Sequence, residues 1–156
     1  MIDLARMAAL VAVLAAAVVY GTDVFCAVVQ RPALARVDDR ALVAVMGNVH
    51  RYGDRRMPVP GALGIIAAAV SGALAALSGR WTATAAAATA VGLLLMWLVL
   101  YVRVSAPINR RLTTAVNAGD VPPNARVLQS DWDRVITARA VLQGLAIAAL
   151  CLALLN

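Results

Sequence analysis

Residues 7–29 read MAALVAVLAAAVVYGTDVFCAVV, and this stretch decides the class of fold. It is apolar throughout, apart from the carboxylate of Asp23 and a few small polar side chains. A helix needs about 20 such residues to cross ~30 Å of hydrocarbon, and this run is long enough. Apolar and polar residues do not alternate along it, so a membrane-spanning strand is excluded. A cleavable signal peptide is not indicated, because the run is too long and no small-residue cleavage site follows it.

Three more apolar runs follow, at residues 59–77, 82–102 and 138–155. The chain is 63% hydrophobic and 14% charged, with a mean hydropathy of +0.83. A soluble domain is nearer half apolar and a quarter charged, so disordered classes are excluded and a soluble enzyme is disfavoured. We therefore predict an all-α fold. One domain, residues 1–156, forms an integral membrane bundle of four transmembrane helices.

The arginines are distributed unevenly between the connections. Six lie between the first two runs and five between the last two, whereas the short second connection holds only Arg80. Because positive residues accumulate on the cytoplasmic side, the two long connections are predicted to be cytoplasmic and both termini extracytoplasmic. The protein is then a multi-pass protein of the cell membrane. The net charge of +6 does not indicate nucleic acid, since these arginines flank apolar runs and few aromatic residues are present to stack on bases.

Both long connections are predicted to contain a short helix. Asp38 or Asp39 can cap a helix that runs to about Tyr52. Residues 122–123 are two prolines that can open a second polar helix, which continues through Trp132 into the fourth span.

The two cysteines, Cys26 and Cys151, are predicted not to form a disulfide. They lie near opposite ends of the first and fourth runs, ~20 Å or more apart at ~1.5 Å per helical residue. A disulfide needs Cα atoms within ~7 Å. Both are expected to be free and buried.

Asp23 is the polar residue that most needs a reason. A carboxylate in a transmembrane helix costs up to about 3 kcal/mol, usually faces the bundle interior and usually has a partner. One interpretation is functional: a proton carrier, a metal ligand or a substrate anchor. The other is a structural ion pair with Arg139 or Arg103, and the sequence favours neither.

His50 is the only histidine, and Asp54 follows it four residues later. On a helix these two side chains share a face. With Asp23 they would supply two carboxylates and one imidazole, the set used by non-heme iron. Without a metal, Asp54 could orient the imidazole. The alternative is a solvated surface pair.

These polar groups converge on the predicted topology. Asp23, His50 and Asp54 lie near the cytoplasmic ends of spans one and two, and Asn109 and Arg139 border spans three and four on the same side. We expect one polar cluster at the cytoplasmic mouth of the bundle. Such a cluster suits a small lipophilic ligand with one polar end.

At this point the sequence resembles the anthrone oxygenase-like family of small four-span membrane proteins. The matching pieces are residues 21–25 (GTDVF) followed by 31–34 (RPAL), then 107–112 (PINRRL), then Trp132 with Arg139. Together with the layout of the spans, the resemblance covers nearly the whole chain. It implies the four-span fold, and it implies an oxygenase that converts polycyclic anthrones to anthraquinones with no established cofactor.

Two parts of the chain depart from the family pattern. Ile136 and Thr137 stand where an asparagine commonly precedes the arginine of span four, and the charged segment 52–57 is a subgroup feature. The resemblance therefore carries the fold further than it carries the substrate.

Three functions follow from these observations. The first is an oxygenase-like oxidoreductase for a lipophilic aromatic or quinone-like substrate. In it His50 or Asp23 is the base and Arg139 or Asn109 stabilises the enolate; a variant binds a divalent metal such as iron through Asp23, His50 and Asp54. The second is a non-catalytic membrane protein that binds a lipid or hydrophobic ligand, or a subunit of a larger complex. The third, a transporter, is disfavoured by the lack of inverted repeats. Assembly into a homo-oligomer is compatible with each of these functions.

Overall fold

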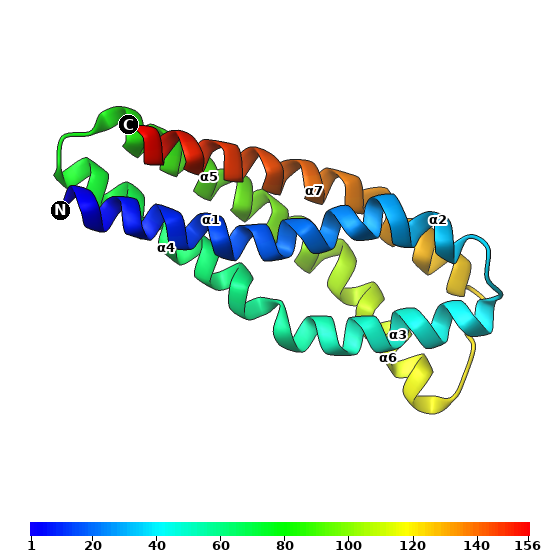
Figure 1. The fold of residues 1–156 in the computed structure, drawn as a ribbon. Helices are drawn as coiled ribbons and strands as arrows, with labels where there is room; N and C mark the ends of the chain where they lie inside the picture. Colours follow the sequence, from blue (N-terminus) through cyan, green and yellow to red (C-terminus); the bar gives the residue numbers. More distant parts are fainter.

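The structure, a computed structural model, describes all 156 residues and is entirely helical. Nine helical segments occur in order: α1 (Ile2–Phe25), η1 (Cys26–Gln30), α2 (Arg31–Leu34), α3 (Asp39–Arg56), α4 (Pro58–Leu77), α5 (Trp81–Leu100), η2 (Tyr101–Ser105), α6 (Ala106–Ala118) and α7 (Ala125–Leu155). The predicted all-α four-helix bundle is confirmed. Figure 1 shows an elongated bundle with both termini at one end.

Four continuous helices are long and apolar enough to cross a membrane: Ile2–Leu34, Pro58–Leu77, Trp81–Ala118 and Ala125–Leu155. They contain the four predicted runs and extend beyond them. The first has 33 residues, about 50 Å at ~1.5 Å per residue, against ~30 Å of hydrocarbon. The chain is thus a multi-pass membrane protein, and three of its four spanning helices are longer than the hydrocarbon is thick.

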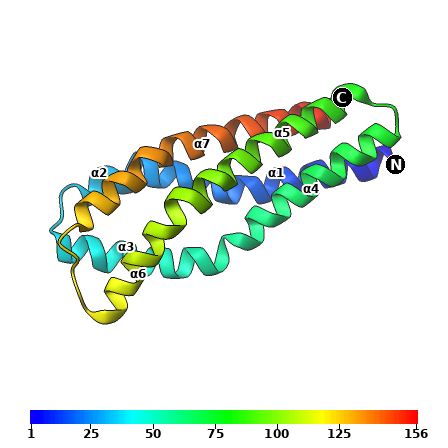
Figure 2. The ribbon, with the colours of Figure 1, turned by 180° about the vertical axis from the view of Figure 1, so that it is seen from behind.

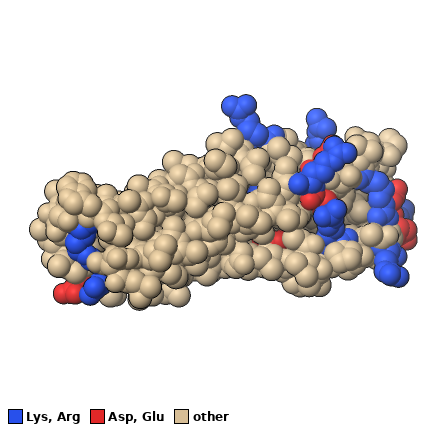
Figure 3. All heavy atoms as spheres, turned by 90° about the horizontal axis from the view of Figure 1, so that it is seen from above, with Lys and Arg blue, Asp and Glu red and all other residues tan.

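The bundle has a polar end opposite the termini, made of α2, α3, α6 and the first turns of α7. Figure 3 shows Arg side chains gathered at this end, and a middle section almost without charge. Here α3 packs against α6, while in the membrane section α1 packs on α4 and α7, and α5 on the same two helices (Figures 1 and 2). The polar end is therefore a second packed section of the same bundle, built mainly on the contact between α3 and α6.

Two cores of different composition fill these two sections. In the membrane section the core is mostly alanine, as at Ala12, Ala68 and Ala146, which are completely buried. Small side chains let the helices approach closely: a Cβ on Gly64 would meet the backbone nitrogen of Ala16 at 3.4 Å. The polar end has a core of larger side chains, such as Leu112 and Ile136. Cavities are easier to form where two such cores meet than inside either.

The helix ends largely follow the predictions. Asp38 caps α3, because its Oδ1 accepts a 2.7 Å hydrogen bond from the amide of Ala41. The helix runs to Arg56 rather than stopping near Tyr52, and it passes through Gly53 without a break. The second polar helix is continuous with the fourth span as expected, but it begins at Ala125, after the two prolines rather than at them.

Both cysteines are free, as predicted, and Cys26 is buried. The expectation that Cys151 is also buried is wrong, since it lies on an exposed face of α7. It is a small apolar residue in an apolar helix, and composition alone does not say which face of such a helix meets lipid.

Two π-helical turns, η1 and η2, interrupt the first and third spanning helices at corresponding places. The amide of Arg31 bonds to the carbonyl of Cys26, and that of Ala106 to the carbonyl of Tyr101, five residues back in each case. Each turn ends two residues before a proline, Pro32 or Pro107. A proline has no amide hydrogen and its ring crowds the carbonyl four residues earlier, so the helix widens before it. These turns set the direction of the site residues next to them.

Candidate functional site

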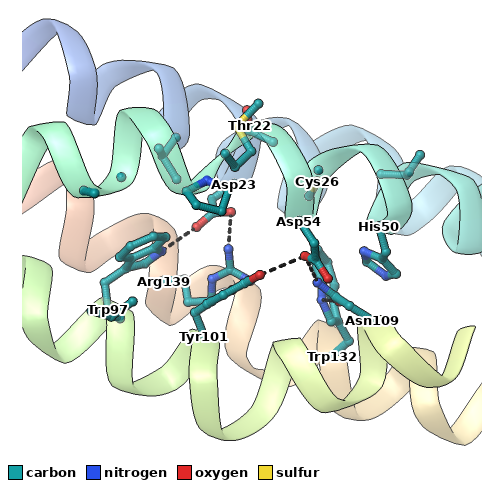
Figure 4. Close-up of a pocket in the computed structure, with 18 of the residues that line it drawn as sticks. Thr22, Asp23, Cys26, His50, Asp54, Trp97, Tyr101, Asn109, Trp132 and Arg139 are labelled. Atoms are coloured by element: carbon teal, nitrogen blue, oxygen red, sulfur yellow. Dashed lines mark hydrogen bonds and ion pairs between the residues drawn. The ribbon is translucent and has the colours of Figure 1, made fainter. Parts of the chain in front are cut away.

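Asp23 forms a buried ion pair inside the bundle. It is 3% exposed. Its Oδ1 accepts a 2.7 Å hydrogen bond from Nη2 of Arg139, and its Oδ2 accepts a 3.1 Å bond from Nε1 of Trp97 (Figure 4). Oδ2 also accepts a 2.6 Å bond from Nε2 of Gln143. Of the two interpretations of Asp23, the structure contains the ion pair, and Arg139 rather than Arg103 is the partner. With both oxygens occupied by strong donors, this carboxylate is poorly placed to act as a base.

Arg139 is surrounded by aromatic rings. Its guanidinium carbon lies 5.8 Å from the ring centroid of Trp97, 5.5 Å from that of Tyr101 and 5.7 Å from that of Trp132. Desolvated contacts of this kind are worth about 2 kcal/mol or more each. Its Nη1 donates to Oγ of Ser105, and its Nε has no hydrogen-bond partner. The cation is therefore held by three rings, one carboxylate and one hydroxyl, while its Nε–H has no partner.

A second carboxylate, Asp54, organises the polar end of the site. Its Oδ1 accepts 2.8 Å and 2.7 Å hydrogen bonds from the hydroxyl of Tyr101 and from Nδ2 of Asn109. Oδ1 of Asn109 in turn accepts a 3.0 Å bond from Nε1 of Trp132. Trp132 is itself buried, 5% exposed, and lines the cavity. Four segments, α3, η2, α6 and α7, are thus joined through one carboxylate.

His50 is the least satisfied residue of the site. It lies on α3, one turn before Asp54, and is 4% exposed. Its ring centroid is 5.5 Å from that of Trp132, and its Nε2 has no hydrogen-bond partner. Burial lowers the pKa of His50 from 6.5 to about 4, although the nearby carboxylate of Asp54 opposes this shift. The imidazole is therefore neutral at pH 7 and can accept a proton or a hydrogen bond.

These groups line one cavity of about 410 Å³, which lies where the two cores meet. Figure 4 shows Asp23 and Arg139 on one side of it, with Asp54, Asn109 and His50 toward the polar end. The part that reaches into the membrane section is apolar, and is lined by Val19, Ile65, Ile66, Leu95 and Leu98. A volume of this size is typical of sites for small organic molecules.

The predicted metal site is not assembled. No three His, Cys, Asp or Glu side chains are close enough to share an ion. The physical reason lies in the partners: Asp23 is held by Arg139, while Asp54 is held by Tyr101 and Asn109. A metal would have to displace the Arg139 guanidinium to reach Asp23, and without Asp23 the remaining pair, His50 and Asp54, supplies only two ligands.

All five predicted site residues line the cavity, namely Asp23, His50, Asp54, Asn109 and Arg139. The sequence analysis missed four others that complete the site: Trp97, Tyr101, Ser105 and Gln143. Two signals could have found them. Trp97 and Tyr101 are one helical turn apart, as are Arg139 and Gln143, and Gln143 is an uncharged polar residue inside a span.

The fold and the site together define a class: a four-helix membrane bundle with a buried ion pair beside an apolar cavity. No protein-family model, no curated protein and no solved structure matches this chain. The resemblance to the anthrone oxygenase-like family therefore stays a prediction.

Proposed function

We propose that this protein is an oxygenase-like oxidoreductase that acts on a lipophilic aromatic or quinone-like substrate in the cavity. The observation that carries the proposal is His50, a neutral and buried imidazole with no partner at the polar end of an apolar cavity. A buried polar atom without a partner is costly, so it is expected to have a use. A substrate with one polar end would satisfy it.

The apolar part of the cavity supports a lipophilic substrate. It is lined by aliphatic side chains of α1, α4 and α5, all of which belong to helices that can span the membrane. The polar residues of the cavity, such as His50 and Asp54, lie next to the arginine-rich polar end of the molecule. A substrate can therefore keep its ring system at hydrocarbon depth while its polar group meets His50 and Arg139.

The chemistry that fits is proton removal followed by reaction with oxygen. Nε2 of His50 takes a proton from an activated ring CH₂, which leaves a carbanion whose charge spreads onto an adjacent carbonyl oxygen. The free Nε–H of Arg139 would stabilise that oxygen. The carbanion adds O₂ and regains one proton to give a hydroperoxide, which loses water and becomes a carbonyl. The sum is CH₂ + O₂ → C=O + H₂O, and no metal is required in it.

The proposed orientation places the polar end in the cytoplasm and both termini outside. The two connections of the polar end hold eleven of the 14 arginines. Because arginine-rich connections are retained on the cytoplasmic side, the cavity opens near that face of the membrane.

The proposal is tested by oxygen uptake with anthrone as substrate, using protein in lipid nanodiscs. His50→Gln should lower the rate about a hundredfold or more, as loss of a general base does. Asn48→Ala is the matched control. Asn48 lies on the exposed face of the same helix, and its side chain donates only to the carbonyl of Ala44 in that helix. Its replacement should leave the rate unchanged. A His50→Gln protein as fast as its parent would refute the role of the imidazole.

The second candidate is a non-catalytic protein that binds a lipophilic ligand. It is favoured by one observation: Asp23, the buried carboxylate, is already bonded to three donors of the protein and is not free to act as a base. In that case anthrone would bind, as seen by quenching of Trp97 and Trp132 fluorescence, without oxygen uptake. His50→Gln would then change affinity alone.

A further inference from the structure

A second hollow runs along the membrane section of the bundle, between α4 and α5. It has a volume of about 370 Å³ and is lined only by residues of these two helices: Ala68, Ala69, Gly72, Ala73, Ala76, Thr84, Ala88 and Val91. All but two of them are alanine or glycine. Side chains this small leave a shallow furrow between the two helices. By themselves they would fit lipid or another helix equally well.

The cavity opens to the membrane at the head of this furrow. Ile66 and Leu95 line the cavity, yet they are 61% and 46% exposed. Lining and exposure together mean that these two side chains form a rim. One belongs to α4 and the other to α5.

The rim and the furrow lie on the same faces of the two helices. Ile66 precedes Ala69 by three residues, and Leu95 follows Val91 by four, which are the spacings of neighbours on one helix face. The two rim residues are thus in line with the furrow, which extends from them toward the termini. Together the cavity and the furrow extend from Tyr101, which bonds to Asp54, to Thr84 near the start of α5. These two residues are 17 positions apart, about 25 Å at ~1.5 Å per helical residue.

The polar end of the cavity needs a polar group from its ligand. His50 is 4% exposed, lines the cavity and has no partner for Nε2. An acyl chain alone would leave it unsatisfied, whereas a compact polycyclic molecule would satisfy it and leave the furrow unused.

We propose that the occupant is a long-chain phenol lipid, whose head in its keto form carries a ring CH₂ beside a carbonyl. The head meets His50, and the chain leaves between Ile66 and Leu95 to lie in the α4–α5 furrow. This inference rests on the proposed function and gives its substrate class. It also gives the source of the substrate, which is the bilayer and not the aqueous phase. The ring moves sideways from lipid past the two rim residues, and the chain never leaves an apolar environment.

Photocrosslinking in nanodiscs tests the path. The probe is 4-dodecylphenol with a diazirine at the end of the chain, and the labelled residues are identified by mass spectrometry. Labels should concentrate in the furrow, at positions such as Ala73 and Ala88. Excess unlabelled 4-dodecylphenol should remove them, whereas 4-methylphenol, which has no chain, should compete much less.

Variants of the rim and the furrow make the test specific. Ile66→Trp together with Leu95→Trp should lower furrow labelling by about tenfold or more, because two indoles fill the opening. Val70→Trp together with Val99→Trp is the matched control, since these residues are exposed on the same helices and do not line the cavity. Ala73→Leu with Ala88→Leu, which fills the furrow and spares the rim, should have the same effect as the first pair.

The outcomes separate this inference from the proposed function. Labels spread evenly over lipid-facing residues, or rim variants that label like the controls, would overturn the long-chain path. Oxidation of anthrone, which has no chain, would then still proceed and depend on His50, so the proposed function would stand. Conversely, furrow labelling without any His50-dependent oxidation would support a lipid-binding site and remove the enzyme.

Discussion

The buried pair of Asp23 and Arg139 predicts a large loss of stability when one partner is removed. Asp23→Ala deletes three hydrogen bonds and leaves a guanidinium that is only 6% exposed without its counter-charge. Breaking a buried pair in this way costs about 3–5 kcal/mol. Asp23→Asn should cost roughly half as much, because one amide oxygen can still accept from Arg139.

The second half of this prediction is a double-mutant cycle. Asp23→Ala combined with Arg139→Met removes both charges and fills the space with an apolar chain. Since apolar replacement of a whole buried pair is often nearly neutral, the double variant should recover most of the loss and come within about 1–2 kcal/mol of the parent. A single variant alone cannot separate a lost pair from a general disturbance of α1.

The assay is unfolding in mixed micelles, followed by tryptophan fluorescence and circular dichroism. Thr22→Ala is the control, because the Thr22 hydroxyl bonds only to the carbonyl of Val18 in its own helix, and it should change stability by less than about 0.5 kcal/mol. The reasoning fails if Asp23→Ala costs less than about 1 kcal/mol, or if adding Arg139→Met brings no recovery. Either result would mean that the guanidinium finds water or another partner.

Three further predictions concern other parts of the molecule. Gly47→Ala should destabilise the packing of α3 on α6 by about 1–3 kcal/mol, because the added Cβ would come within 2.6 Å of the backbone of α6. Gly53→Ala on the same helix is the control: its Cβ would meet nothing within 4 Å, so it should be neutral or stabilising by up to about 1 kcal/mol. Thermal unfolding of the two variants compares their stabilities. Because the pKa of His50 is lowered from 6.5 to about 4, the unfolded chain binds a proton in this pH range that the folded protein does not. The free energy of unfolding should therefore fall by on the order of 3 kcal/mol as pH drops through this window. His50→Gln should abolish that part of the dependence in unfolding titrations, and an unchanged slope would contradict it. In protein without its native cysteines, a cysteine at Arg51 should react with an impermeant maleimide only from the cytoplasmic side and one at Arg80 only from outside; the reverse pattern would invert the proposed orientation.

Much of the fold could be predicted from local sequence, because the membrane makes local composition decisive. Each span had to satisfy its own backbone hydrogen bonds, so a run such as 7–29 could only be a helix. The cap at Asp38 was also predictable, because capping is a local interaction between a side chain and an amide three residues later. The π-helical turns were not predicted, although the prolines that follow them are visible in the sequence.

The site was predicted in part. Asp23, His50, Asp54, Asn109 and Arg139 were expected to converge, and all five line one cavity. The roles did not follow from the sequence. His50 and Asp54 share a helix face as their spacing requires, yet Asp54 is bound by Tyr101 and Asn109, and no metal group forms.

The sequence by itself determined that this chain is a helical membrane bundle with one anomalous carboxylate, because hydropathy and spacing act within single helices. The tertiary structure decided which charge neutralises Asp23, why the imidazole of His50 has no partner, and where the cavity meets the membrane. Those outcomes depend on the rotation of each helix about its own axis and on the width of two π-helical turns. The packing of four alanine-rich surfaces sets these rotations together, and no single segment carries that information.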